Sequence, residues 1–93
     1  MFTWLNKQGV KSSDGFILQR VHRFYYFFEK GDKKMQVYVE PGVPCEGVYK
    51  DSFDKWMPPH ENIVISDEEK ESIKMNVSDA LNFMGVSFKF IKG

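Results

Sequence analysis

The residue types that could carry out acid–base chemistry are few in this sequence and lie far apart. His22 stands beside Arg23, with Tyr25 and Tyr26 shortly after it. A base, a cation and a phenol grouped in this way would suit a ribonuclease-like site. A polar residue at a strand bend is the more ordinary role for such a histidine, and we favour that role for His22.

The other reactive side chains lack suitable partners. His60 and Glu61 follow two prolines, and no further metal ligand of suitable spacing accompanies them. Cys45 is the single cysteine, so an internal disulfide is excluded. A nucleophilic role for Cys45 needs a histidine that the sequence does not place beside it. We therefore predict a protein without catalytic activity, bound metal or cofactor.

Composition and charge narrow the class of protein. The chain has 93 residues, which form one small domain over residues 1–93, and its aromatic fraction of 16% favours a folded core. Thirteen basic side chains balance thirteen acidic ones, which makes nucleic-acid binding through a broad basic surface unexpected. No signal peptide and no run of ~20 apolar residues is seen, so we expect a cytoplasmic protein that does not contact membranes.

Short strands and turns must position any site in the first two thirds of the chain. Alternating and aromatic runs predict strands over residues 16–21, 24–30, 35–40 and 47–49, and either a short strand or an ordered arm over residues 2–5. His22 and Arg23 form either a bend between two strands or the middle of one long strand. Residues 51–56 predict about one and a half helical turns that end at Pro58-Pro59, with Phe53 and Trp56 on the inner face.

The longest regular element is a helix near the end of the chain. Ser66 and Glu69 have the spacing of a capping box, and Gly85 stands where a left-handed cap would end the helix. Residues 86–91 then alternate as a last strand. The predicted fold is α+β: an antiparallel sheet of about four to six strands with one main C-terminal helix packed on one face, followed by that last strand. The apolar stripe of the helix consists of Ile73, Val77, Ala80, Leu81 and Met84.

The most aromatic stretch is FYYFFEK at residues 24–30. RNA-binding sheets stack bases on such rings, but the basic-glycine-aromatic signature of those sheets is absent here. We favour core packing plus a partly exposed aromatic face, with a protein-binding surface as the next interpretation. The core face of this strand is either Phe24, Tyr26 and Phe28, or Tyr25 and Phe27.

The order and spacing of several motifs resemble those of a known family. Together they are similar to small bacterial immunity proteins of polymorphic toxin systems, most of all the immunity protein 74 family. The resemblance implies an α+β fold, no catalysis, and the binding and neutralisation of a cognate toxin domain. It identifies neither the toxin nor the residues that contact it. The motifs are Gln8-Gly9-Val10, Asp14-Gly15-Phe16, Glu29-Lys30-Gly31-Asp32, Trp56-Met57-Pro58-Pro59, Ile65-Ser66-Asp67-Glu68-Glu69, Ile73, Asn76, Ala80-Leu81, Phe83 and Gly85.

The candidate partner-binding residues are chosen on physical grounds. Aromatic side chains would anchor a partner, and carboxylates would steer a basic one, such as a nuclease toxin. Trp56 and Tyr49 would be anchors only if they are exposed. The alternative function is a small accessory domain that binds a peptide, RNA or another subunit through an aromatic sheet face, and a homodimer through an edge strand is also open. The candidates are Tyr25, Tyr38, Glu46, Tyr49, Asp51, Asp54, Trp56 and Glu61.

Overall fold

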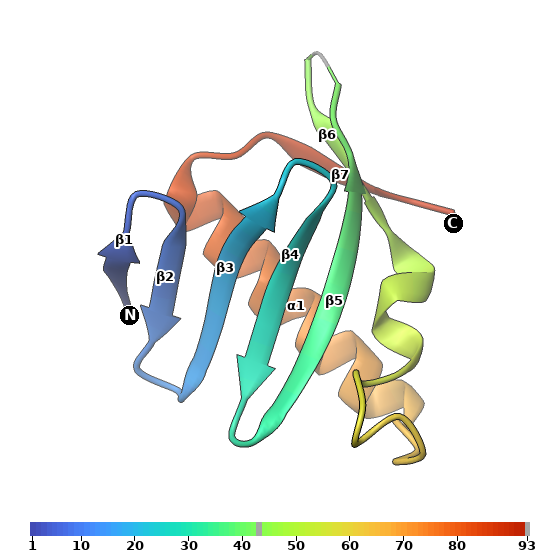
Figure 1. The fold of residues 1–93 in the computed structure, drawn as a ribbon. Helices are drawn as coiled ribbons and strands as arrows, with labels where there is room; N and C mark the ends of the chain where they lie inside the picture. Colours follow the sequence, from blue (N-terminus) through green and yellow to red (C-terminus); the bar gives the residue numbers. More distant parts are fainter. Residues whose placement is uncertain (43, 93) are drawn as a thin grey trace.

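A computed structural model describes residues 1–42 and 44–92 of the chain. Within this part, one seven-stranded sheet carries one α-helix on one face, so the predicted α+β class is confirmed (Figure 1). Neighbouring strands are antiparallel except β6 and β7, which are parallel. The strands lie in sequence order: β1 (Phe2–Asn6), β2 (Gly9–Ser12), β3 (Phe16–His22), β4 (Tyr25–Lys30), β5 (Lys33–Glu40), β6 (Glu46–Tyr49) and β7 (Phe88–Ile91).

The sheet has more strands than the four to six predicted, because residues 2–12 form a hairpin of β1 and β2. The turn between these strands consists of Lys7 and Gln8, and the Gln8 N–H donates to Asn6 Oδ1 at 2.8 Å. Such a turn, closed by an asparagine side chain, carries neither glycine nor proline at its centre. A second two-residue turn, at Arg23 and Phe24, separates β3 from β4 and decides for the bend interpretation.

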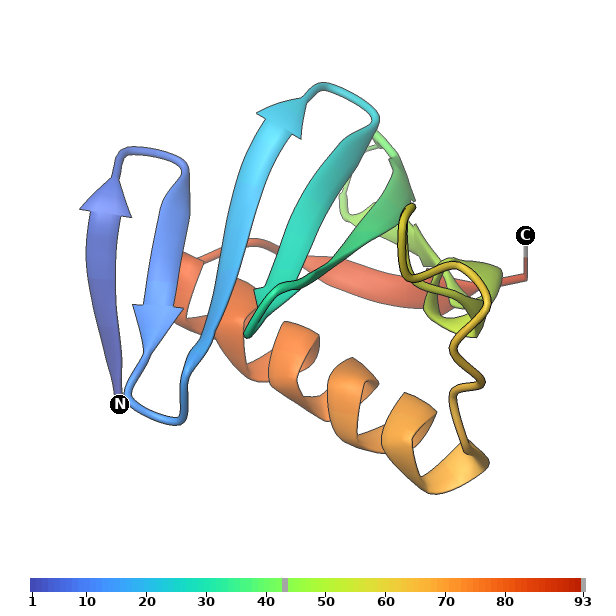
Figure 2. The same ribbon diagram turned by 60° about the horizontal axis from the view of Figure 1, so that its bottom comes forward.

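The helix α1 (Asp67–Met84) begins and ends at the residues that the sequence indicates. Ser66 Oγ accepts a hydrogen bond from the Glu69 N–H at 3.1 Å, which caps the N-terminus. Gly85 adopts a φ of 79°, and the Val86 N–H donates back to the Leu81 carbonyl. This cap turns the chain back, so that β7 runs alongside β6 (Figure 2).

The core lies between α1 and the face of the sheet that α1 covers. In β4 the buried residues are Tyr26 and Phe28, whereas Tyr25 and Phe27 are half-buried on the other face and Phe24 lies exposed in the turn. In β5 the buried residues Met35, Val37 and Val39 follow the predicted alternation. From α1, four residues of the predicted stripe are buried: Ile73, Val77, Ala80 and Leu81.

A short 3-10 helix, η1 (Lys50–Asp54), follows β6 at the edge of β5. It ends at Asp54, four residues before the prolines that were predicted to end it, because Lys55 already has extended backbone angles. Phe53 and Trp56 are both buried, as predicted. The Trp56 ring lies 6.3 Å from the Phe28 ring, measured between centroids, so the segment after η1 is fastened to the core.

Candidate functional site

The face of the sheet opposite α1 is not covered by any element in the described part of the chain (Figure 2). Aromatic side chains line up across it. The rings of His22 and Tyr25 stack at 4.9 Å with an interplanar angle of 14°, and Tyr38 lies across from Tyr25 at 6.1 Å. Phe27 lies 5.5 Å from Tyr25 and receives the Lys34 ammonium at 4.9 Å. We call His22, Tyr25, Phe27 and Tyr38 the aromatic row.

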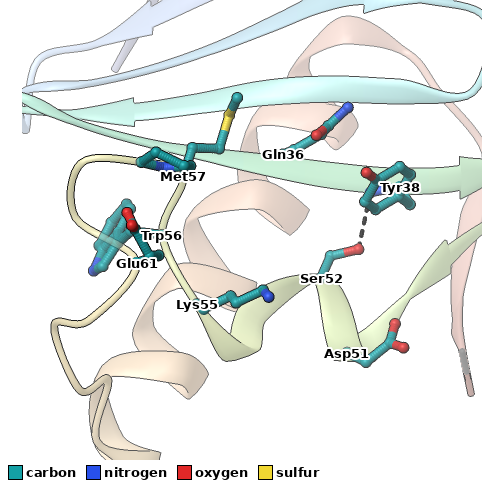
Figure 3. Close-up of a pocket in the computed structure, with 9 residues that line it drawn as sticks. Gln36, Tyr38, Asp51, Ser52, Lys55, Trp56, Met57 and Glu61 are labelled. Atoms are coloured by element: carbon teal, nitrogen blue, oxygen red, sulfur yellow. Dashed lines mark hydrogen bonds between the residues drawn. The ribbon is translucent and has the colours of Figure 1, made fainter.

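A groove of about 460 Å³ lies where β5 meets η1, and we call it the β5–η1 groove (Figure 3). Gln36 and Tyr38 of β5 form one wall, and Asp51 and Ser52 of η1 form the other. The chain that follows η1 completes it with residues 55–58 and Glu61. Because Tyr38 is 48% exposed and belongs both to the groove and to the aromatic row, the two features form one continuous surface.

Two hydrogen bonds hold the walls of the groove together. The Tyr38 N–H donates to Ser52 Oγ at 2.8 Å, and the Met57 N–H donates to the Lys34 carbonyl at 2.8 Å. Ser52 is only 8% exposed, so its hydroxyl serves the strand rather than solvent. The groove is therefore framed by fixed contacts and is formed before any partner arrives.

The groove combines apolar walls with a charged rim. Trp56 and Met57 supply apolar surface, and the side chains of Asp51, Lys55 and Glu61 are exposed around it. Two carboxylates against one ammonium leave the rim negative. Such a site can bury an uncharged group of a partner and attract basic residues beside it.

The sequence model of the immunity protein 74 family matches residues 21–91. The chain belongs to this family. The match to the immunity protein 74 family runs from the end of β3 to the end of β7. It includes every residue that lines the β5–η1 groove. No curated protein and no solved structure matches the chain.

Half of the residues predicted for partner binding come together in this immunity protein 74 fold. Tyr38, Asp51, Trp56 and Glu61 line the β5–η1 groove, and Tyr25 lies beside them in the aromatic row. Trp56 is 2% exposed, so the condition for its being an exposed anchor is not met. Its indole forms part of the groove wall and of the core instead.

Glu46 lies apart from the groove in an internal ion pair. Both of its carboxylate oxygens accept from Arg20 Nη1 at 2.9 Å, and the same nitrogen lies 3.0 Å from the Tyr26 hydroxyl. Burial lowers the pKa of Arg20, but its bonds and charge interactions with Glu46 and Tyr26 outweigh burial and raise the pKa overall. Glu46 is therefore occupied in joining β3, β4 and β6 and is not free to steer a partner.

The two remaining candidates are also engaged within the chain. Asp54 Oδ1 lies 3.3 Å from Lys70 Nζ at the start of α1. The Tyr49 hydroxyl donates to Glu40 Oε2 at 3.4 Å, and its ring is half-buried. Neither residue lines the groove, so the predicted acidic surface is reduced to Asp51 and Glu61.

Other groove residues were absent from the sequence prediction. Gln36 lies on the same face of β5 as Tyr38, so strand alternation alone would have indicated it. Ser52, Lys55 and Met57 carry no such signal, because their positions depend on how η1 packs against β5.

The two histidines are not brought together, and of the set considered around His22 the ring that meets it is that of Tyr25. His22 stacks on Tyr25 in the aromatic row, whereas His60 Nε2 lies 3.6 Å from Asp32 Oδ2 near the β4–β5 turn. Among residues 1–42 and 44–92, no three histidine, cysteine or acidic side chains are grouped as a metal site would require. In the same residues, no helix is both long enough and apolar enough to cross a membrane.

Proposed function

We propose that this protein binds the toxin domain of a polymorphic toxin system and neutralises it as a stoichiometric inhibitor, without catalysis. The observation that carries the proposal is the family match over residues 21–91. The uncovered aromatic row and the adjoining β5–η1 groove support it, because exposed rings beside a preformed recess are typical of a protein-binding surface. The toxin would act in the cytoplasm of the producing bacterium, where the inhibitor would meet it.

The toxin-binding surface that we propose is centred on Tyr38. Tyr25 and Tyr38 would contribute large rings that lose little side-chain conformational entropy on binding. Asp51 and Glu61 would attract a basic toxin such as a nuclease. Tyr49 and Asp54 lie outside the groove and would contribute at most at the rim. Trp56 would act indirectly, by holding the groove open from the core side.

The test is to co-express the protein with the variable C-terminal toxin domain encoded by the neighbouring reading frame. We expect a 1:1 complex on size exclusion and the loss of toxin activity at equimolar inhibitor. Tyr38→Ala should weaken the complex by about tenfold or more, as residues at the centre of an interface do. Met75→Ala is the matched control, because Met75 is 66% exposed on α1, which covers the opposite face of the sheet. The absence of any complex with the wild-type protein would contradict the proposal.

A second candidate function is favoured by the chemistry of the aromatic row itself. Stacked rings with Lys34 close to Phe27 resemble the surfaces on which sheets bind single-stranded RNA, a peptide or another subunit. Titration with a labelled single-stranded RNA at low salt separates the two candidates. Binding that weakens steeply with salt would favour an accessory RNA-binding domain over an inhibitor of a toxin.

Self-association through an edge strand is the further partner interaction that we propose. β1 lies at one end of the sheet and contains no charged residue, and its Trp4 and Leu5 are 46% and 49% exposed. Uncharged edges of this kind can pair with a second copy. Sedimentation of the wild-type protein and of a Leu5→Lys variant tests the dimer, which the added charge should abolish.

A further inference from the structure

The backbone N–H and C=O of Gln36 point away from β4, in the plane of the sheet, on the side where η1 and the β5–η1 groove lie. Gln36 lies opposite Phe27 in the β4–β5 ladder, and the Val39 N–H donates to the Phe24 carbonyl on the β4 side. In an antiparallel pair, residues alternate between those that bond to the partner strand and those whose N–H and C=O point away from it. Val39 belongs to the first kind, so Gln36, three positions earlier, belongs to the second.

The residues on either side of Gln36 use their outward groups, but Gln36 does not. The Lys34 backbone carbonyl accepts from the Met57 N–H, and the Tyr38 backbone N–H donates to Ser52 Oγ. The strand β6 joins β5 only further along, at residues 39–40. Among the described residues, no hydrogen bond involves the Gln36 N–H or C=O. Within the described residues, the N–H and C=O of Gln36 are therefore an unpaired donor and acceptor, located between the hydrogen bonds made by Lys34 and Tyr38.

The shape of this gap limits what can occupy it. A whole strand cannot add to β5 here, because Ser52 and Met57 already close the edge on both sides. The free groups belong to a single residue, so the occupant must offer one acceptor and one donor close together. A carboxamide does this in one plane, whereas a carboxylate offers only acceptors, and an ammonium or guanidinium offers only donors.

The surroundings favour an uncharged group for the same position. Trp56 and Met57 provide apolar lining beside Gln36, against which an uncharged group can pack. The charges of Asp51, Lys55 and Glu61 lie at the exposed rim. An asparagine or glutamine within a basic segment fits both features.

We propose that the β5–η1 groove is a receptor for one asparagine or glutamine side chain of the partner, whose amide pairs with the N–H and C=O of Gln36. The identity of the partner rests on the proposed function, whereas the chemistry of the groove does not. The carboxamide accepts from the Gln36 N–H and donates to the Gln36 C=O, while its methylene group packs against Met57.

The groove chemistry is tested first without any partner. The ¹⁵N-labelled protein is titrated with acetamide, and with acetate and guanidinium at the same concentrations. We expect the Gln36 backbone amide to shift with acetamide much more than with either ion. The Val64 amide is the control, because Val64 is 88% exposed and lies outside the groove. Equal shifts of Gln36 and Val64, or acetate acting as well as acetamide, would overturn the inference.

The second test uses the toxin domain and a change that removes only the donor. Proline is tolerated on a strand where the N–H faces away from the ladder, so Gln36→Pro deletes the free N–H and leaves the β4–β5 bonds intact. We expect its affinity for the toxin domain to fall about tenfold, since one buried acceptor loses its partner. Gln36→Ala keeps both backbone groups, so any loss of affinity it causes measures the side chain alone, and Gln36→Pro should bind clearly more weakly than Gln36→Ala.

The outcomes separate the two proposals. If wild type binds the toxin domain and Gln36→Pro binds equally well, the carboxamide receptor is wrong and the proposed function stands. If wild type binds no toxin domain, the proposed function fails and the acetamide titration decides the groove alone. If Gln36→Pro does not fold, the acetamide titration of wild type again decides.

Discussion

The Tyr38 N–H of β5 donates to the buried hydroxyl of Ser52 in η1 at 2.8 Å, across fourteen positions of sequence. A serine side chain thus does at the edge of the sheet what a neighbouring strand would otherwise do. The bond fixes η1 against β5, and this placement creates the β5–η1 groove. The groove therefore depends on a hydroxyl whose hydrogen bond is made within the fold.

Replacing Ser52 by alanine should destabilise the domain. The Tyr38 N–H would lose its acceptor, and leaving this part-buried donor unpaired should cost about 1 kcal/mol, the lower end of the range for a buried donor. Urea denaturation followed by circular dichroism measures the free energy of unfolding. Ser87→Ala is the matched control, because Ser87 is exposed and uses only its backbone carbonyl, as an acceptor for Glu46. Equal stability of the two variants would show that the Tyr38–Ser52 bond contributes nothing.

Charge reversal at the groove should slow the association with a basic toxin domain. Asp51→Lys changes the rim from net negative to net positive, and we expect the association rate at low salt to fall severalfold. The difference should shrink at high salt because exposed charges are screened. Stopped-flow mixing measures the rate.

Two further variants locate this electrostatic effect. Asp79→Lys places the same charge on the C-terminal half of α1, away from η1, and should leave the association rate near that of wild type. Glu46→Gln should lower stability through loss of the Arg20 ion pair and leave the rate unchanged. A slower rate in Glu46→Gln would restore the acidic role that the sequence predicted for this residue.

Tyr26 makes stability sensitive to alkaline pH. Burial and the charge of Glu46 raise the pKa of this phenol, against the opposing effect of Arg20. The folded protein therefore keeps the proton when the unfolded chain loses it, at a pH of about 10. Stability should be constant below that pH and fall as the pH rises beyond it. Tyr26→Phe should show a shallower loss in urea denaturation between pH 9 and pH 11, and identical slopes would refute this account.

Trp56 contributes through its ring rather than through its N–H. Among the described residues, its buried Nε1 has no hydrogen-bond partner. Trp56→Ala should cost about 3–5 kcal/mol because it empties a core position. Trp56→Phe keeps a ring against Phe28 and removes the unpaired donor, so it should cost clearly less. Thermal unfolding of both variants checks the order, and equal losses would point to a role for the indole nitrogen.

Local signals made much of the fold predictable. The cap residues Ser66 and Gly85 bound α1 as expected, and the alternation in β5 assigned its buried face, because each signal lies within a few residues of what it controls. The hairpin of β1 and β2 was not indicated, since an asparagine side chain closes its turn.

The site was only partly predictable, because it depends on residues that meet across long separations. Tyr38, Asp51 and Glu61 were identified by residue type, but nothing local shows that Ser52 would reach β5. Glu46 was assigned to the surface because its partner Arg20 lies 26 positions away. Charge and aromaticity can be read from a sequence, whereas the neutralisation of a charge by a distant residue cannot.

The parallel pairing of β6 and β7 has a kinetic consequence. Strands β1 to β5 pair with their sequence neighbours and can form as local hairpins, whereas Gly47 meets Lys89 only after α1 has folded back across the sheet. Contacts between distant residues form late when they require a long loop to close. Phe90→Ala in β7 should therefore speed unfolding much more than it slows folding, as a chevron plot would show. In such a domain the strand that pairs last during folding is also the first to separate during unfolding.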